Sequence, residues 1–173
     1  MTKTQIAALF TTLLAVSATA CSNAGVQPTR AASAAVACEG GTVRNDDDAA
    51  RFDGCQAIVG DLRIIRSDLI DVAAFRDLRQ VSGKLVIEGN AKLVSLAGLK
   101  NVEHARSVEI RDNRVLAAFP TLLPQLKHVD ESVVLDANRG LTKSQISALV
   151  ARVEVRAEQV TANLDPALAS GAN

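Results

Sequence analysis

The sequence predicts a mainly β fold, a single right-handed parallel β-helix of about five rungs with a short capping helix at each end. A short pattern recurs four times, beginning at residues 60, 83, 106 and 131, so its starts are 23, 23 and 25 residues apart. Each copy alternates apolar and polar residues over one strand length and ends on Ser67, Asn90, Asn113 or Asn138. A nearly constant period in the twenties, with one strand per repeat, is typical of a solenoid whose rungs stack on their neighbours.

Composition limits the kind of core and the kind of partner. The chain has 173 residues, of which 48% are hydrophobic, but it contains four Phe and no Trp or Tyr. Its length suits one domain, and the core must be built from Leu, Ile, Val and Ala. With 19 basic and 19 acidic residues the net charge is zero, which argues against nucleic acid and against a polybasic membrane-binding patch.

Residues 1–20 have the features of a secretory signal peptide. Lys3 precedes the apolar run Ile6–Val16, which is too short to span a bilayer, and small residues follow. Cys21 comes directly after Ala18-Thr19-Ala20. This segment resembles the lipobox of bacterial lipoproteins, although that family usually has Leu where this chain has Ala18. The resemblance implies that Cys21 carries palmitate-type acyl chains and becomes the mature N-terminus. The alternative is ordinary signal cleavage nearby.

The predicted location follows from the same resemblance. In lipoproteins of two-membrane bacteria, a residue other than Asp after the lipidated Cys implies transfer to the outer membrane, and Ser22 is such a residue. Residues 21–37 are rich in Ala and Ser and lack periodicity, so we expect a flexible tether between the lipid and the folded domain. A frayed helix over the Ala-rich end of the tether is the alternative. The expected location is therefore the bacterial cell envelope, at the outer membrane.

The segment after the tether predicts an N-terminal cap. The run Asn45-Asp46-Asp47-Asp48 supplies N-cap acceptors and negative charge for a helix over about 46–52. Consecutive Asp residues fit capping better than the alternating ligands of a calcium loop. If Cys21 is lipidated, Cys38 and Cys55 remain as a pair, and an oxidising envelope compartment favours a disulfide between them. Two thiols without a nearby His are a poor metal site.

The cap and the first strand together resemble a known family. The stretch Cys38-x-Gly40, the capped acidic segment and Phe52-x-Gly54-Cys55-x-x-Ile58-x-Gly60-Asp61-Leu62-x-Ile64 are similar to the receptor L domain. That is the ligand-binding β-helical domain of the insulin and epidermal growth factor receptors, and it has relatives in secreted bacterial proteins. The resemblance covers about residues 38–155, within a domain that we place at 38–160. It implies that a sheet face binds ligand, and it transfers no individual contact residue.

Alternation divides each strand into a core face and an exposed face. Two core columns are expected: Leu62, Leu85, Val108 and Val133, and then Ile64, Ile87, Ile110 and Leu135. Two exposed columns lie between them: Arg63, Val86, Glu109 and Val134, and then Ile65, Glu88, Arg111 and Asp136. Opposite charges in the last column favour register between neighbouring strands. These eight exposed residues are the candidate binding face. A solvated face that only holds register is the alternative.

Further columns are expected at the turns. Asn90, Asn113 and Asn138 share one position, where an amide side chain can satisfy backbone groups of the next rung, so we expect a structural ladder. Three residues after the Asn position, one residue of each repeat aligns as a core position, and these four residues are Ile70, Leu93, Leu116 and Leu141. Two prolines predict an outward bulge within residues 117–127.

The C-terminal part predicts a second cap and a tail. Thr142 and Gln145 have capping-box spacing, and apolar residues follow at helical intervals, which predicts a helix over about 143–152. A short strand at 153–155 and a disordered tail at 161–173 complete the chain.

One pair of histidines raises the question of a metal. His104 and His128 align if one gap is allowed, and with Glu103 or Asp130 they could hold an ion. Stacked surface residues explain the same spacing, so we predict no metal and no cofactor.

The residues show no catalytic constellation: the sequence has no Gly-rich phosphate loop and no His in a nucleophile arrangement. We predict a non-enzymatic lipoprotein whose β-solenoid displays a recognition surface for a protein or glycan partner at the cell envelope. One alternative is a structural, lipid-tethered component of an envelope assembly without a soluble ligand, and another is a hydrolase of unfamiliar type.

Overall fold

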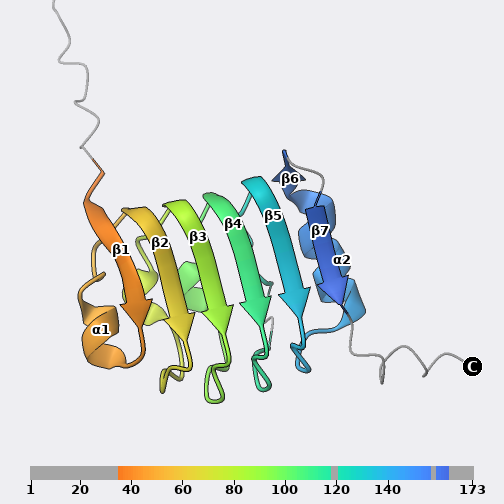
Figure 1. Cartoon of the computed structure of the whole chain (residues 1–173), viewed down its shortest axis with the longest axis horizontal. Coiled ribbons are helices and arrows are strands. Elements are labelled where there is room, and N and C mark those ends of the chain that lie inside the picture. Colours follow the sequence, from red (N-terminus) through yellow and green to blue (C-terminus); the bar gives the residue numbers. More distant parts are fainter. Residues whose placement is uncertain (1–34, 118–120, 157–158, 164–173) are drawn as a thin grey trace, which may run out of the picture. The chain divides into compact units, whose positions relative to one another are not determined.

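The strands of this protein form one parallel sheet and follow each other in chain order (Figure 1). A computed structural model describes residues 35–117, 121–156 and 159–163. The five long strands are β1 Ala37–Val43, β2 Ala57–Ile65, β3 Gln80–Glu88, β4 His104–Arg111 and β5 His128–Asp136. Two short strands, β6 Glu154–Val155 and β7 Gln159–Asn163, pair with the first and second half of β5. The fold is therefore mainly β, as the sequence predicts.

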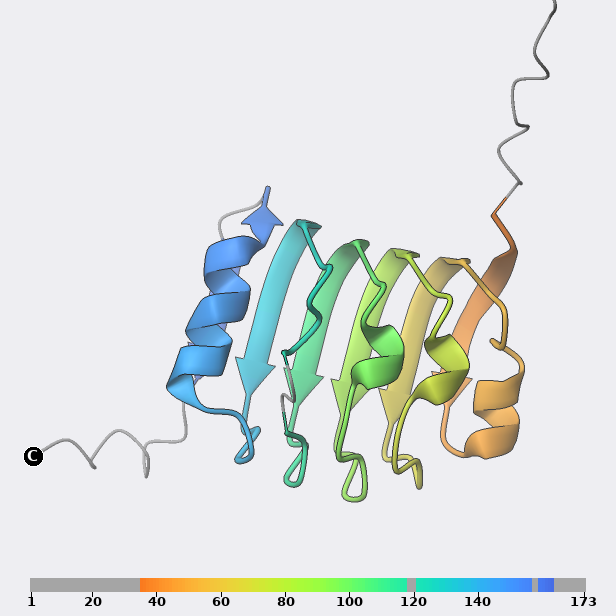
Figure 2. The same cartoon turned by 180° about the vertical axis from the view of Figure 1, so that it is seen from behind.

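The sheet is open, and its two faces differ. The connections between strands run behind the sheet and include two short 3-10 helices, η1 Ala73–Phe75 and η2 Ala97–Leu99 (Figure 2). The front face, seen in Figure 1, carries no covering element among the described residues. Among the described strands β1 pairs only with β2, and β7 pairs only with β5, so the sheet does not close. We call the uncovered side the open face.

The core lies between the sheet and the connections, and helices cover its two ends. Helix α1, Asp46–Ala50, lies behind β1, and helix α2, Lys143–Arg152, lies behind β7 (Figures 1 and 2). Asn45 caps α1, and Thr142 with Gln145 forms a capping box on α2. Both helices are therefore confirmed, because local capping chemistry specifies them.

The register of the core columns follows the sequence alignment. Leu62 pairs with Leu85, Leu85 with Val108 and Val108 with Val133. The second column pairs in the same way, and every member of both columns is at most 1% exposed. Branched apolar side chains stacked on the same face fill each layer between its neighbours. The strands begin about three residues before the aligned repeats, since β2 starts at Ala57 and β3 at Gln80.

The residue after each of the strands β2 to β5 has a left-handed backbone conformation. Its φ angle is +48° at Arg66, +66° at Gly89, +46° at Asp112 and +52° at Ala137. The backbone N–H of the first three donates to the last residue of the following strand, for example from Arg66 to Glu88 at 2.9 Å. This repeated corner turns the chain away from the sheet, although only one of the four positions is the glycine that such a conformation favours.

One predicted core position is wrong. Ile70 is 64% exposed, and Leu69 occupies the buried column with Leu93, Leu116 and Leu141. The first turn is one residue shorter than the others, since Ser67 and Leu69 are two residues apart whereas Asn90 and Leu93 are three apart. Aligning all four turns at one length therefore shifts the first by one residue.

The structure has one more strand at each end than the sequence analysis assigned. Strand β1 lies in the segment that we gave to the cap, and β7 includes residues 161–163, which we gave to the tail. Glu39-Gly40-Gly41 has low strand propensity, and β1 is a strand because β2 supplies its hydrogen-bond partners.

Some predictions fall on residues outside the described part of the chain. The predicted signal peptide, Cys21 and most of the predicted tether are outside it, as are residues 118–120 of the expected bulge and 164–173 of the predicted tail. Of the rest of the bulge, Leu122, Leu123 and Leu126 are buried. No helix among the described residues is long and apolar enough to cross a membrane.

Candidate functional site

The open face of the sheet carries the eight predicted binding residues, side by side on four strands. Arg63, Val86, Glu109 and Val134 pair in one column, and Ile65, Glu88, Arg111 and Asp136 pair in the next. Arg63 is exposed, and six of the others are half-buried. Val86 is only 7% exposed, so its assignment as an exposed residue is wrong. It lies between Arg63 and Glu109, whose longer side chains shield a valine from water.

The charges near Val86 are arranged around Glu109. The Glu109 side chain is 19% exposed and forms ion pairs with Lys84 at 3.4 Å and with Arg111 at 3.3 Å. The Nε of Arg111 is buried and has no hydrogen-bond partner in the described structure. A buried donor without a partner costs about 1–3 kcal/mol. Arg111 is therefore held in place at some cost to the fold.

Two carboxylates on the open face, those of Asp61 and Glu131, form hydrogen bonds that join neighbouring strands. The backbone N–H of Lys84 donates to Asp61 Oδ1 at 2.9 Å, and Arg63 forms an ion pair with Asp61 at 2.8 Å. These two interactions lower the pKa of Asp61, the Lys84 N–H more than Arg63. A Cβ at position 83 would overlap the Asp61 carboxylate, so the contact requires Gly83.

Glu131 bridges β5 and β4 in the same way. Arg106 donates to its carboxylate at 2.8 Å and the Ser107 hydroxyl donates to it at 3.1 Å. The Arg106 guanidinium, followed by the Ser107 hydroxyl, lowers the pKa of Glu131. Asp61, Glu109 and Glu131 are therefore each paired with at least one basic side chain.

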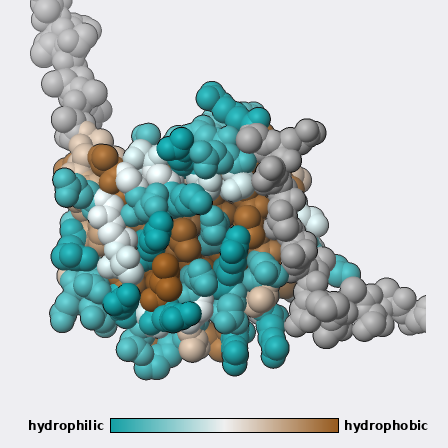
Figure 3. Space-filling model, in the orientation of Figure 1, coloured by the Kyte–Doolittle hydropathy of each residue, from teal (hydrophilic) through white to brown (hydrophobic). Residues whose placement is uncertain are grey.

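The open face also carries small apolar patches between its charged side chains. Figure 3 views the molecule from the open face and shows apolar patches surrounded by hydrophilic side chains. The apolar members of the two columns are Ile65, Val86 and Val134. The described residues contain only two aromatic side chains, Phe52 and Phe75, and both are buried in the core.

A shallow hollow, which the sequence analysis missed, lies where β1 meets β2. It is lined by Gly40, Gly41 and Gly60 and by the charged residues Asp61 and Arg63. The pairing of β1 and β2 is irregular here, because the register shifts between Glu39 and Gly41. The cluster of glycines is the sequence signal that could have located this hollow.

The predicted asparagines follow the C-terminal ends of β3, β4 and β5 and form a continuous hydrogen-bond ladder. Asn90 and Asn113 are fully buried and Asn138 is 9% exposed. Each Nδ2 donates to a carbonyl of the preceding strand: Asn90 to Ile64 at 2.9 Å, Asn113 to Ile87 at 2.9 Å and Asn138 to Ile110 at 2.7 Å.

The oxygen of each amide completes the ladder. Asn113 Oδ1 accepts from the backbone and the side chain of Asn90, and Asn138 Oδ1 accepts from those of Asn113. Ser67 donates from both its backbone N–H and its hydroxyl to Asn90 Oδ1 at 2.8 Å. The ladder therefore bonds four successive turns, and the Asn90, Asn113 and Asn138 amides are used in hydrogen bonds within the fold.

The two histidines are register partners on β4 and β5, and each has its own carboxylate. His104 Nε2 lies 3.1 Å from Asp130, and His128 Nδ1 lies 3.2 Å from Glu154. Among the described residues no group of three or more His, Cys, Asp or Glu could hold a metal ion.

The acidic run at residues 46–48 also has a local role, since Asp48 accepts a hydrogen bond from the Arg44 N–H at 3.0 Å.

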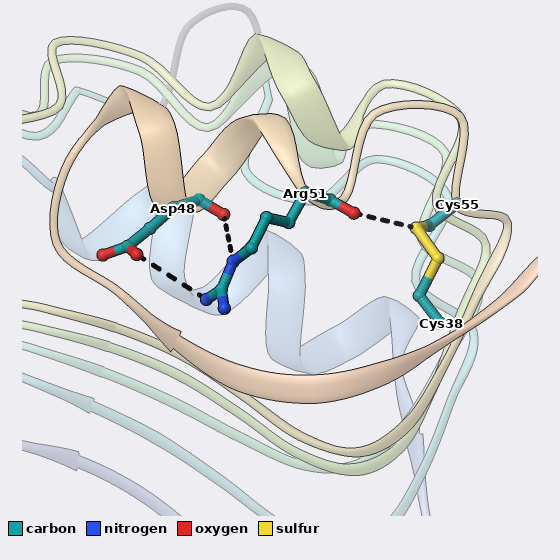
Figure 4. Close-up of a disulfide and its surroundings, with 4 residues drawn as sticks. All are labelled: Cys38, Asp48, Arg51 and Cys55. Atoms are coloured by element: carbon teal, nitrogen blue, oxygen red, sulfur yellow. Dashed lines mark hydrogen bonds and ion pairs between the residues drawn. A yellow bond between two sulfur atoms is a disulfide. The ribbon is translucent and has the colours of Figure 1, made fainter.

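A disulfide joins the two described cysteines and is confirmed. Cys38, near the start of β1, is bonded to Cys55, just before β2, and α1 lies in the loop between them (Figure 4). The two Cα atoms are 5.9 Å apart. Arg51, the C-cap of α1, forms an ion pair with Asp48 of the same helix at 3.6 Å in the same view. The bond fixes the first strand to the second.

Comparison with known proteins was made at the level of family, sequence and fold. No protein-family model, no curated protein and no solved structure matches it. The fold and the open face define a mainly β protein with one parallel sheet that is uncovered on one side among the described residues.

Proposed function

We propose that this protein is a non-catalytic lipoprotein of the bacterial cell envelope, which recognises a protein partner through the open face. In this proposal the domain is a right-handed β-helix of the receptor L-domain type. The recurring sequence of long strand, left-handed corner, Asn position and return connection supports that architecture. The parallel pairing of neighbouring strands and the Asn ladder support it too.

The observation that carries the recognition proposal is the pairing of charges among small apolar patches of the open face. Protein interfaces combine an apolar centre with a polar rim, and their energy depends on a few anchors. On the open face Val86 and Val134 lie on either side of Glu109, and Glu109 and Asp61 each form ion pairs with basic side chains. Since these charged side chains are already held, binding loses less conformational entropy than it would with free side chains.

A protein is a better fit than a glycan. Small-ligand sites are usually lined by hydrophobic and aromatic side chains, and the chain has no Trp or Tyr. The two described Phe side chains are in the core. A broad face with charges of both signs suits a protein surface of complementary charge pattern.

The lipid anchor is the part of the proposal that concerns Cys21. With Cys38 and Cys55 joined to each other, Cys21 is the one remaining Cys of the sequence. Each buried CH₂ of an acyl chain contributes roughly 0.8 kcal/mol, so two or three chains give stable anchoring. Cys21→Ser is expected to move the protein from the membrane fraction to the soluble fraction. Unchanged fractionation would contradict the anchor.

The open face is tested with two double variants of equal net charge. Arg63→Glu with Glu88→Lys changes the open face, and Asp68→Lys with Lys92→Glu exchanges an exposed ion pair at the turns. A photo-reactive side chain at Ile65 identifies the partner, whose affinity is then measured for each variant.

We expect the open-face variant to bind about tenfold or more weakly, and the turn variant to bind like the unchanged chain. Equal binding by both variants would exclude the open face as the recognition surface.

A further inference from the structure

The two ends of the sheet carry opposite charge although the whole chain is neutral. The first end, residues 35–54 with β1 and α1, contains five acidic and two basic residues, a net charge of −3. The second end, residues 139–156 with α2 and β6, contains four basic residues and one acidic residue, a net charge of +3. We call these the acidic end and the basic end.

Exposed side chains carry much of this charge. At the acidic end Asp46 and Asp47 are exposed in the first turn of α1. At the basic end Lys143 and Arg156 are exposed. The buried side of α2 contains Ile146 and Leu149. Its exposed positions include three small residues that permit close approach of another surface: Ser147, Ala148 and Ala151.

The two ends also have the same layered arrangement. At the acidic end a strand, β1, lies in front and a helix, α1, lies behind it; at the basic end β7 lies in front and α2 behind (Figures 1 and 2). Both are edge strands, and every strand pair in the sheet is parallel. A second copy moved along the sheet without rotation would therefore bring β1 next to β7 with the correct strand direction, and α1 next to α2.

We propose that copies of this chain associate end to end, with the acidic end of one copy against the basic end of the next. An exposed edge strand is a template for pairing with another chain, and opposite charges on the two surfaces favour this pairing over contact between two like ends. The contact uses two different surfaces and relates the copies by a shift along the sheet rather than by a rotation that closes a ring, so it produces a linear row. This association goes beyond recognition through the open face, which remains accessible in the row.

Sedimentation velocity of the full chain in mild detergent tests the proposal. At about 0.02 M salt we expect the sedimentation coefficient to rise with protein concentration. At about 0.5 M salt, where the Debye length is only a few ångströms, we expect monomer.

Charge-reversal variants distinguish end-to-end contact from nonspecific association. Lys143→Glu with Arg156→Glu makes both ends acidic, and Asp46→Lys with Asp47→Lys makes both ends basic. Each variant alone is expected to associate about tenfold or more weakly, whereas an equimolar mixture of the two associates again because unlike ends then meet. A matched control, Lys92→Glu with Arg114→Glu at the exposed turns, makes the same charge change away from the ends and is expected to associate like the unchanged chain.

Three results would overturn the proposal: an unchanged chain that stays monomeric at low salt, association that neither reversal weakens, or a mixture that fails to associate although both variants keep their melting transition. If a reversed variant loses that transition, Ala151→Glu on the exposed side of α2 replaces the basic-end variant. It is expected to weaken association in the same way, and normal association of a folded Ala151→Glu chain would likewise contradict the proposal.

Discussion

The buried asparagines show how one side chain can determine a register. The Oδ1 of each amide accepts a hydrogen bond from the preceding turn, and its Nδ2 donates one to a carbonyl of the preceding strand. The site therefore requires both an acceptor and a donor. An Asp has the same shape and keeps the acceptor, but it lacks the N–H donors. The chain provides a matched comparison, because Asn45 caps α1 through its Oδ1, which accepts from the Asp48 N–H at 2.8 Å.

Asn113→Asp is expected to destabilise the fold by about 3 kcal/mol or more. The new carboxylate would lie buried against the Ile87 and Arg111 carbonyl oxygens, and a buried charge without a donor is costly. Asn45→Asp should change stability by only a few tenths of a kcal/mol, since Asp is an equally good N-cap. Urea unfolding measures both. Equal effects at the two sites would show that the donors of the ladder add little.

The lowered pKa of Asp61 predicts a pH dependence. Because the pKa is lower in the folded chain than in the unfolded chain, the charged carboxylate stabilises the fold above the ordinary value of about 3.9. This contribution is lost as the pH falls through the folded pKa. The chain should therefore be more stable than Asp61→Asn at neutral pH, and the difference should shrink below about pH 4. A difference that is constant with pH would contradict the assignment.

The left-handed corner predicts a stabilising substitution. Ala137 has a φ of +52°, which costs an L-residue roughly 1 kcal/mol relative to Gly. Ala137→Gly is expected to raise the free energy of unfolding by about 0.5 kcal/mol, after the larger entropy of Gly in the unfolded chain is included. Ala151→Gly, in α2, should lower it by up to about 1 kcal/mol. Thermal unfolding of the two variants should give shifts of opposite sign.

At the scale of elements, sequence reasoning succeeded where the signal is local. Alternation predicted β2 to β5 and their register, and the capping residues predicted α1 and α2. Strand β1 and residues 161–163 of β7 were missed because their strand conformation depends on a paired neighbour rather than on their own residues. Leu69 was missed because one turn is a residue shorter than the rest.

The disulfide predicts a measurable stabilisation of the first element pair. Cys38 and Cys55 are 17 residues apart, and closing a loop of that length stabilises by about 3 kcal/mol on the chain-entropy estimate. Replacing both with Ala is expected to lower the free energy of unfolding by about this amount, and an oxidised sample should show no free thiol at either residue. Cys21→Ser serves as the control and should leave unfolding unchanged.

At the scale of the whole molecule, each repeat packs mainly on its two neighbours, so the apolar side chains at both ends of the core must be covered by other elements. Val133 and Leu135 of β5 are about 1% exposed, and α2 with β6 and β7 lies at this end of the sheet. A chain ending at Leu141 would expose this apolar layer. We expect it to be insoluble or to bind an apolar dye strongly, whereas a chain ending at Asn163 should remain soluble. A soluble, cooperatively folding chain ending at Leu141 would contradict the capping role.

The candidate site was predictable in outline only. Alternation identifies which residues share the open face, since the side chains of a strand alternate. It cannot tell that Val86 is shielded, because shielding depends on how Arg63 and Glu109 lie across the neighbouring strands. It also missed the bridge from Asp61 to the Lys84 N–H, which requires a glycine on the next strand.

The position of the disulfide has a mechanical consequence for a protein held by its N-terminus. A pulling force that enters at Cys38 passes through the sulfur–sulfur bond to Cys55, so residues 39–54, with most of β1 and all of α1, bear no tension. The first strand to carry load is β2, which is hydrogen-bonded on both sides by β1 and β3. While the disulfide is intact, tension applied on the N-terminal side of Cys38 therefore does not peel β1 away, and the sheet resists extension from its second strand onward.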